Sequence, residues 1–261
     1  MADFLDTLTR DSKINCRNGY YRVLPGGMNA ERRKVSLRES IEGRTGNAII
    51  AEIKRASPSK GTIRSDPDIG RLASAMERGG AAGISVLTEP SHFNGSLADL
   101  VLARGSVALP LLMKDIVLDR SQVEAASRMG ADAVLLIKAI FDRDYADCRL
   151  EAMIDLVHSL GMEVLLEVHT SEEFREAMGL EADLIGVNNR DLGTLRVDLR
   201  TTERILAAHR GCPAVVVSES GISSPADVLF LKGVGARAFL VGSSVMLAGD
   251  VEDKVRELVE A

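Results

Sequence analysis

Apolar and polar positions alternate regularly along most of the chain. From residue 48 onward, short apolar runs typical of buried strands alternate with amphipathic stretches whose apolar positions follow the period of an α-helix. The predicted strands are residues 48–54, 83–89, 110–115, 133–138, 163–169, 184–190, 214–220 and 238–244. The predicted helices are residues 67–80, 97–104, 119–130, 144–161, 171–179, 198–209, 224–235 and 250–261. Eight strand–helix units in strict alternation predict a parallel sheet covered by helices.

The number of units favours an α/β fold in which the sheet closes, a single (β/α)₈ or TIM barrel. The 261 residues match the usual size of one such barrel. A doubly wound open sheet has the same alternation, because periodicity does not reveal closure. Residues 1–47 precede the pattern, and we expect them to form an N-terminal extension with short helices near residues 3–12 and 35–43 and a loop over residues 25–34. Residues 48–261 are then the catalytic barrel domain.

Composition and charge narrow the classes of function. The net charge is −6 and the isoelectric point is near 5.4, so we expect no nucleic-acid partner and no anionic membrane surface. An anionic substrate would need a local positive pocket. The apolar runs are too short to cross a bilayer and the first residues lack a signal-peptide pattern, which predicts a cytoplasmic protein. The three cysteines and four histidines show no metal-ligand spacing, so we predict no metal site.

Charged side chains gather at the carboxyl ends of the predicted strands. In a (β/α)₈ barrel these ends together form the active-site face. Alternate residues of a strand share a face, so Glu167 and His169 point the same way. The other polar residues at strand ends are Glu52, Lys54, Lys114, Asn188, Arg190 and Glu219. Structural ion pairs would explain them, but titratable groups converging from five strands favour catalysis. Lys138 fits either explanation equally.

Glycines at the ends of the last two strands suggest a phosphate site. Gly221 follows Ser220, and Gly242 precedes Ser243. Glycine lets a phosphate approach backbone N–H groups, and the loops after the seventh and eighth strands are the recurrent phosphate site of this fold. One such turn alone is weak evidence, but the two together favour a phosphorylated ligand.

With these residues in view, the chain resembles the indole-3-glycerol phosphate synthase family of tryptophan biosynthesis. The matching segments fall in order on all eight predicted strands: IIAEIKRASPSKG (49–61), LTEPSHFNGS (87–96), LPLLMKD (109–115), GADAVLLI (130–137), LLEVH (165–169), IGVNNRDL (185–192), VSESGI (217–222) and FLVGSSVM (239–246). The resemblance implies a cofactor-free carboxy-lyase that converts 1-(2-carboxyphenylamino)-1-deoxyribulose 5-phosphate to indole-3-glycerol phosphate, releasing CO₂ and water.

The resemblance also implies roles for individual residues. The implied catalytic residues are Glu52, Lys54, Lys114, Glu167 and Glu219. The implied substrate contacts are Ser57, Pro58, Phe93, Asn94, Leu135, Asn188, Arg190 and Ser220, and the implied phosphate contacts are Gly221, Gly242 and Ser243. The extension, which carries apolar residues including Phe4, Leu8, Val23 and Leu24, would cap the site. We expect a monomer, and the resemblance allows docking to other tryptophan-pathway enzymes.

Two other functions compete with this interpretation. Phosphoribosylanthranilate isomerase, another (β/α)₈ enzyme, is expected to use Cys and Asp at the ends of its first and fifth strands, where this chain has Glu52 with Lys54 and Glu167. A catalytically silent phosphosugar-binding barrel has no need of five charged catalytic positions. A turnover assay separates these functions.

Overall fold

The computed structural model describes residues 3–22, 34–58 and 60–261. Val23, Leu24 and residues 25–33 of the predicted loop therefore lie outside the described residues.

Eight parallel strands close into a barrel, as the sequence predicts. They are β1 (Ala48–Ile53), β4 (Gly83–Leu87), β5 (Leu111–Lys114), β6 (Ala133–Ile137), β7 (Glu163–Val168), β8 (Leu184–Asn188), β9 (Val216–Glu219) and β10 (Ala238–Val241). The ring closes because β1 pairs with β10 on one side, Ala48 opposite Ala238, and with β4 on the other, Ile50 opposite Gly83. Closure excludes the doubly wound open sheet.

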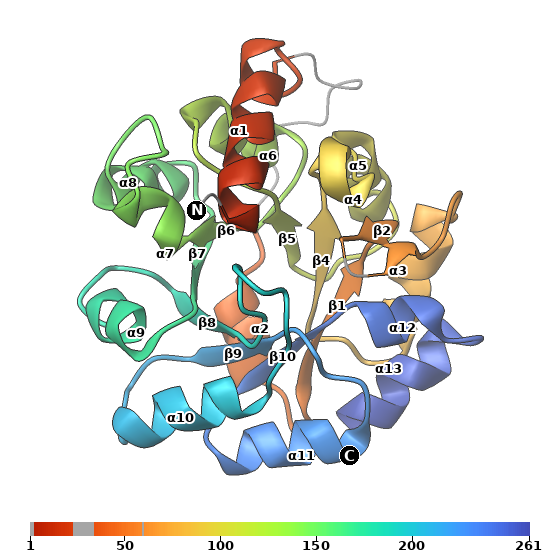
Figure 1. Ribbon diagram of the computed structural model, residues 1–261. Helices are drawn as coiled ribbons and strands as arrows, with labels where there is room; N and C mark the ends of the chain where they lie inside the picture. Colours follow the sequence, from red (N-terminus) through yellow and green to blue (C-terminus); the bar gives the residue numbers. More distant parts are fainter. Residues whose placement is uncertain (1–2, 23–33, 59) are drawn as a thin grey trace.

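Helices surround the barrel in Figure 1. The helices that follow the strands are α3 (Ile69–Arg78), α5 (Leu97–Arg104), α6 (Arg120–Arg128), α8 (Leu150–Ser159), α9 (Ser171–Ala177), α10 (Arg200–Ala208), α11 (Pro225–Gly233) and α13 (Val251–Val259). None of the described helices is long and apolar enough to span a bilayer.

Several helix ends follow directly from the residues at those positions. The side chains of Asp68, Ser96 and Asp250 accept hydrogen bonds from the first backbone N–H groups of α3, α5 and α13. Gly80 and Gly130 adopt positive φ angles of 90° and 89° just after α3 and α6, a conformation that glycine allows without strain. These local signals fix where each helix begins and ends.

The structure also contains short elements that periodicity does not predict. They are the two-residue strands β2 (Ala56–Ser57) and β3 (Gly61–Thr62), which form a hairpin, and the helices α4 (Pro90–Phe93), α7 (Lys138–Asp142) and α12 (Ser243–Leu247). Segments of two to five residues are too short to show a repeating pattern. The predicted helix 144–161 is too long: α8 begins at Leu150, because Asp147 instead bonds through its backbone N–H to the carbonyl of Leu118.

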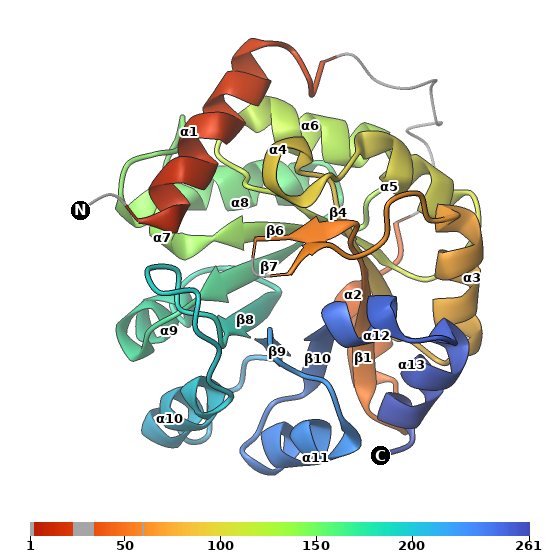
Figure 2. The same cartoon turned by 45° about the vertical axis from the view of Figure 1, so that its right-hand side comes forward.

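The N-terminal extension contacts both faces of the barrel. Helix α1 (Phe4–Arg17) crosses the carboxyl-end face (Figures 1 and 2), where Ser12 donates a hydrogen bond to the carbonyl of Ile116 just after β5. Helix α2 (Leu37–Glu42) lies at the opposite face, where the Leu37 backbone N–H donates to Glu163, the first residue of β7. The extension therefore reaches the active-site end and the far end of the same barrel.

Candidate active site

A cavity of about 430 Å³ opens at the carboxyl ends of the strands. Its volume lies in the range of small-molecule sites. Of the sixteen site residues that the sequence predicts, fifteen line it: Glu52, Lys54, Ser57, Pro58, Phe93, Lys114, Leu135, Glu167, Asn188, Arg190, Glu219, Ser220, Gly221, Gly242 and Ser243. Asn94 does not line the cavity. It is exposed and ends helix α4 in the left-handed conformation, with a φ angle of 51°.

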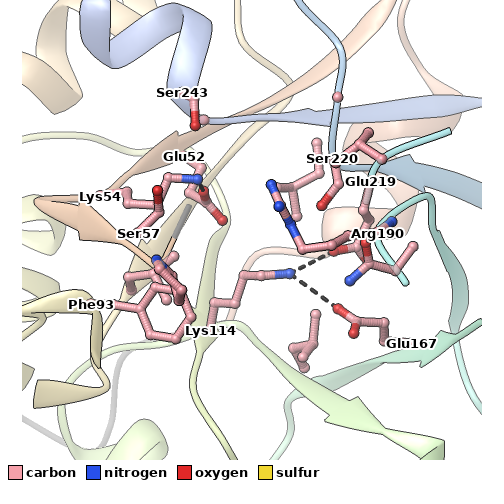
Figure 3. Close-up of a pocket in the computed structure, with 18 of the residues that line it drawn as sticks. Glu52, Lys54, Ser57, Phe93, Lys114, Glu167, Arg190, Glu219, Ser220 and Ser243 are labelled. Carbon is pink, nitrogen blue, oxygen red and sulfur yellow. Dashed lines mark hydrogen bonds and ion pairs between the residues drawn. The ribbon is translucent and has the colours of Figure 1, made fainter. Parts of the chain in front are cut away.

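Lys114 lies at the centre of the charged cluster, as Figure 3 shows. It is the last residue of β5, and its Nζ lies 2.6 Å from Oε2 of Glu219 and 3.3 Å from Oε2 of Glu167. The two carboxylates come from β9, which lies opposite β5 in the ring, and from β7, which is separated from β5 by one strand. Closure of the barrel is what brings these three side chains together.

The cluster keeps a proton on Lys114. Burial disfavours the charged amine, but the carboxylates of Glu219, Glu167 and Glu52 outweigh burial and hold the pKa of Lys114 above its ordinary value. Burial raises the pKa of Glu219 to about 7, although the attraction of Lys114 opposes this rise. The site therefore combines a charged ammonium with a carboxyl group that titrates near neutral pH.

Glu167 stays ionised in the same cluster. Burial favours its neutral form, but Lys114 and His169 overcome burial and lower the pKa of Glu167. Two carboxylates around one lysine thus have environments that push their pKa values in opposite directions.

A second charged pair lies on β1 and in the residue that follows it. Lys54 contacts Glu52 at 2.6 Å between Nζ and Oε1. The carboxylate of Glu52 also lies against Gly242, where any Cβ atom would collide with its Oε1. Glycine at position 242 lets the chain after β10 approach this ion pair, whereas a larger residue would force the Glu52 carboxylate to move.

The charges of the cavity do not form a closed set of ion pairs. Arg190 has no carboxylate within salt-bridge distance among residues 3–22, 34–58 and 60–261, and its guanidinium donates to the carbonyl of Leu195. Within the same described residues, Oε1 of Glu219 is buried without a hydrogen-bond partner. Purely structural ion pairs would satisfy each other, so this arrangement favours a site that binds a ligand.

Backbone turns at the ends of β9 and β10 line the same cavity. Ser220 and Gly221 both have positive φ angles, 67° and 87°, so the chain turns sharply after Glu219. Ser243 begins α12 directly after Gly242, and the first N–H groups of a helix lack acceptors within it. Both turns therefore offer backbone donors to an anion.

Apolar side chains cover the rest of the cavity. Phe93, Leu135 and Pro58 line it, and α1 adds Phe4 and Leu8. This apolar surface suits an aromatic ring, with the charged groups lying beyond it.

Three charged residues of the cavity go beyond the sequence-based prediction: Lys60, Glu89 and Asp115. Asp115 follows Lys114 and is buried, accepting hydrogen bonds from Thr88 at 2.5 Å and Tyr21 at 2.9 Å, and burial raises its pKa to about 7. The sequence offers a signal for Asp115, because this residue directly follows Lys114 at the end of a predicted strand. Glu89 instead caps α4, accepting bonds from three of its backbone N–H groups.

Lys138 and His169 lie outside the cavity lining. Lys138 begins α7, and its ammonium pairs with Asp142 at 2.7 Å and Glu176 at 2.6 Å, on the outer side of the barrel. These pairs account for Lys138 as a structural residue. His169 is largely buried and contacts Glu167 on the side away from the cavity.

Comparison with known proteins identifies the family. The family model described as indole-3-glycerol phosphate synthase matches residues 18–258. An indole-3-glycerol phosphate synthase 2 of Ralstonia nicotianae is 45% identical over 225 residues, which cover 85% of this chain and 82% of the relative. An indole-3-glycerol phosphate synthase of Methanopyrus kandleri is 46% identical over 229 residues, 87% of each chain. The chain belongs to the indole-3-glycerol phosphate synthase family.

Solved structures of more distant proteins share the fold. A thiamine phosphate pyrophosphorylase from Pyrococcus furiosus superimposes with a TM-score of 0.61 at 20% identity, covering 85% of this chain and 96% of that one. An N-acetylmannosamine-6-phosphate 2-epimerase from Clostridium perfringens gives 0.62 at 18% identity, covering 83% and 93%. At these identities the likeness shows the (β/α)₈ barrel alone.

Proposed function

We propose that this cavity is the active site of an indole-3-glycerol phosphate synthase. The enzyme closes the indole ring of 1-(2-carboxyphenylamino)-1-deoxyribulose 5-phosphate and releases CO₂ and water. The observation that carries the proposal is the Lys114 ammonium held between Glu167 and Glu219 at the mouth of the barrel, in a chain of this family.

Lys114 is the proton donor of the first step. The ring carbon that bears the carboxylate attacks the ketone carbon, and the ketone oxygen takes a proton as the new carbon–carbon bond forms. A lysine kept charged by two carboxylates supplies that proton without needing an acidic solution. Loss of CO₂ then restores the aromatic ring.

The final dehydration needs an acid for the leaving hydroxyl and a base for the departing carbon-bound proton. Lys54 is the acid, and either Glu52 or Glu167 is the base. Lys54 and Glu52 lie in contact, while Glu167 stands with Lys114. Glu52→Gln and Glu167→Gln test which of the two residues is the base. The variant that lacks the base should accumulate the hydroxylated, decarboxylated intermediate.

The remaining residues hold the substrate at its two ends. Arg190 pairs with the substrate carboxylate, because its guanidinium has no carboxylate partner within the described chain. Asn188 bonds the amine or a hydroxyl. Gly221, Gly242 and Ser243 hold the phosphate through backbone N–H groups. The apolar side chains listed above surround the anthranilate ring. Asn94 is included among the substrate contacts only because the family resemblance implies it.

The proposal extends to the organisation of the protein. Residues 1–47 form the extension and residues 48–261 the catalytic barrel. We expect a cytoplasmic protein, because the family acts in amino-acid biosynthesis. We also expect a monomer, and the family resemblance allows it to dock to other enzymes of tryptophan biosynthesis.

The experiment is to mix the purified protein with the substrate in the presence of EDTA and to measure CO₂ and product together. We expect one CO₂ for each indole-3-glycerol phosphate, at a rate that EDTA does not change. A silent phosphosugar-binding barrel would leave the substrate intact, and loss of turnover in EDTA that added metal restores would overturn the cofactor-free mechanism.

A further inference from the structure

His169 is a largely buried titratable residue that the proposed mechanism does not use. It follows β7 directly, and strand alternation places it on the same side as Glu167, two residues earlier. Its side chain is 11% exposed, and Nε2 lies 3.3 Å from Oε1 of Glu167. On its other side, Nδ1 lies 3.7 Å from Oε2 of Glu173 in α9. Neither ring nitrogen has an aligned hydrogen bond within the described part of the chain.

Glu167 therefore stands between two cationic side chains. Its Oε2 faces Lys114, and its Oε1 faces His169. A row of alternating groups runs inward from α9: Glu173, His169, Glu167, Lys114 and Glu219. The imidazole is in contact with the one oxygen of Glu167 that Lys114 does not occupy.

The surroundings of His169 favour its charged form. Burial opposes the charge, but Glu173, Glu167 and Glu219 raise the pKa of His169 above its ordinary value. Asp191, in the loop after β8, also acts on the imidazole. Lys138 lies beyond Glu173 and is itself paired with Asp142 and Glu176. Negative groups thus dominate around the ring and favour its charged imidazolium form.

We propose that His169 is a positioning residue that holds the Glu167 carboxylate ionised and turned toward Lys114. The proposal rests on the proposed function of Glu167 in the active site. His169 does not line the cavity, so it acts on the substrate only through Glu167.

The consequence is a dependence on pH with a defined sign. Without the imidazolium, the pKa of Glu167 rises, because one of its two stabilising cations is lost. Glu167 then loses its charge at a pH where the unchanged enzyme keeps it. Above that range Glu167 is ionised in both proteins, so the difference disappears.

His169→Gln tests this proposal through the pH profile of kcat. We expect the acid limb to move to higher pH by about one pH unit, the scale of one opposite charge at this distance. In consequence kcat falls by up to about tenfold at pH values near and below the ordinary glutamate pKa of 4.5 and approaches the normal value at pH 8, while KM changes less than twofold. A merely structural role would lower kcat equally at every pH, and that result, or an unchanged profile, overturns the proposal.

His158→Gln is the matched control. His158 also pairs with a carboxylate, Asp183, at 2.9 Å, but it belongs to α8 on the outside of the barrel. Its removal should leave the acid limb in place. An equal shift in this control would overturn the assignment to His169.

A second measurement does not depend on the folding of His169→Gln. Coupling between two titrating groups is reciprocal, so Glu167→Gln must lower the pKa of His169 by about one pH unit as well. The chain has four histidines, so imidazole resonances can be assigned with single variants of His92, His158 and His209. An unchanged pKa of His169 overturns the proposal.

The same variants separate failure of this proposal from failure of the proposed function. If Glu167→Gln turns over substrate at the normal rate, the role of Glu167 is wrong and that of His169 falls with it. If Glu167→Gln is impaired while His169→Gln keeps the normal profile, the role of His169 alone is wrong.

Discussion

At the residue scale, the site depends on glycines as much as on charged side chains. Gly186 lies in β8 beside β9, and a Cβ atom on it would collide with Oε1 of Glu219. Its absent side chain gives the carboxylate the space from which Glu219 reaches Lys114. The absent side chain of Gly242 likewise leaves space for the carboxylate of Glu52.

Gly186→Ala should therefore impair catalysis more than folding. The added methyl group displaces Glu219 from its 2.6 Å contact with Lys114, and a misplacement of this size costs up to about 100-fold in kcat. Gly233→Ala is the matched control, since a Cβ atom there meets nothing within 4 Å. Steady-state kinetics of both variants check the prediction, and normal kcat in Gly186→Ala would contradict it.

Gly242→Asp tests the phosphate site. A carboxylate beside the backbone donors repels the phosphate dianion and fills its space, so KM should rise at least about tenfold. Because the Cβ atom also meets Glu52, kcat should fall as well. Gly249→Asp, where a Cβ atom has open space, should change neither quantity. An unchanged KM in Gly242→Asp would place the phosphate elsewhere.

At the element scale, the sequence predicts the long strands and helices and misses the short ones. Eight apolar runs repeat the same signal, and N-terminal caps such as Asp68 confirm the helix starts. The hairpin of β2 and β3 and helix α7 carry too few residues for a period to appear. The sequence predicts Lys138 at the end of a strand, whereas this residue begins α7.

The extension shows why a lid and a structural plug could not be separated from sequence. Helix α1 brings Phe4 and Leu8 to the cavity, whereas α2 buries Leu37 against Gly83 at the far end of the barrel. Two short helices in one segment thus contact opposite faces, and only the folded chain assigns each to a face.

Phe4→Ala and Leu37→Ala should divide the two roles of the extension. Phe4→Ala removes apolar surface from the cavity, so KM should rise while the melting temperature stays within about 2 °C. Leu37 is fully buried, so Leu37→Ala should cost about 2 to 5 kcal/mol of folding free energy and leave KM unchanged. Thermal melts and kinetics decide this, and a reversed pattern would contradict the assignment of α1 and α2.

At the scale of the whole molecule, closure of the barrel brings the charged residues at the strand ends together in one site. The sequence predicts that strand-end charges converge, because all parallel strands of a barrel end on one face. It does not predict which charges touch, since the contact of Lys114 with Glu167 and Glu219 depends on the width and register of the closed sheet. A chain with net charge −6 thereby brings four cationic side chains to one cavity: Lys54, Lys60, Lys114 and Arg190.

Turnover of the substrate by the unchanged protein and by Lys114→Ala, side by side, tests the central claim most directly. Indole fluorescence reports product without a tryptophan background from the protein, because the chain contains no Trp. The account predicts a steady rise for the unchanged protein and a rate at least about 100-fold lower for Lys114→Ala. Lys254→Ala is the control with normal turnover, since Lys254 is a half-buried lysine of α13 that pairs with Glu257. No rise with the unchanged protein, or an equal rise with Lys114→Ala, would contradict it.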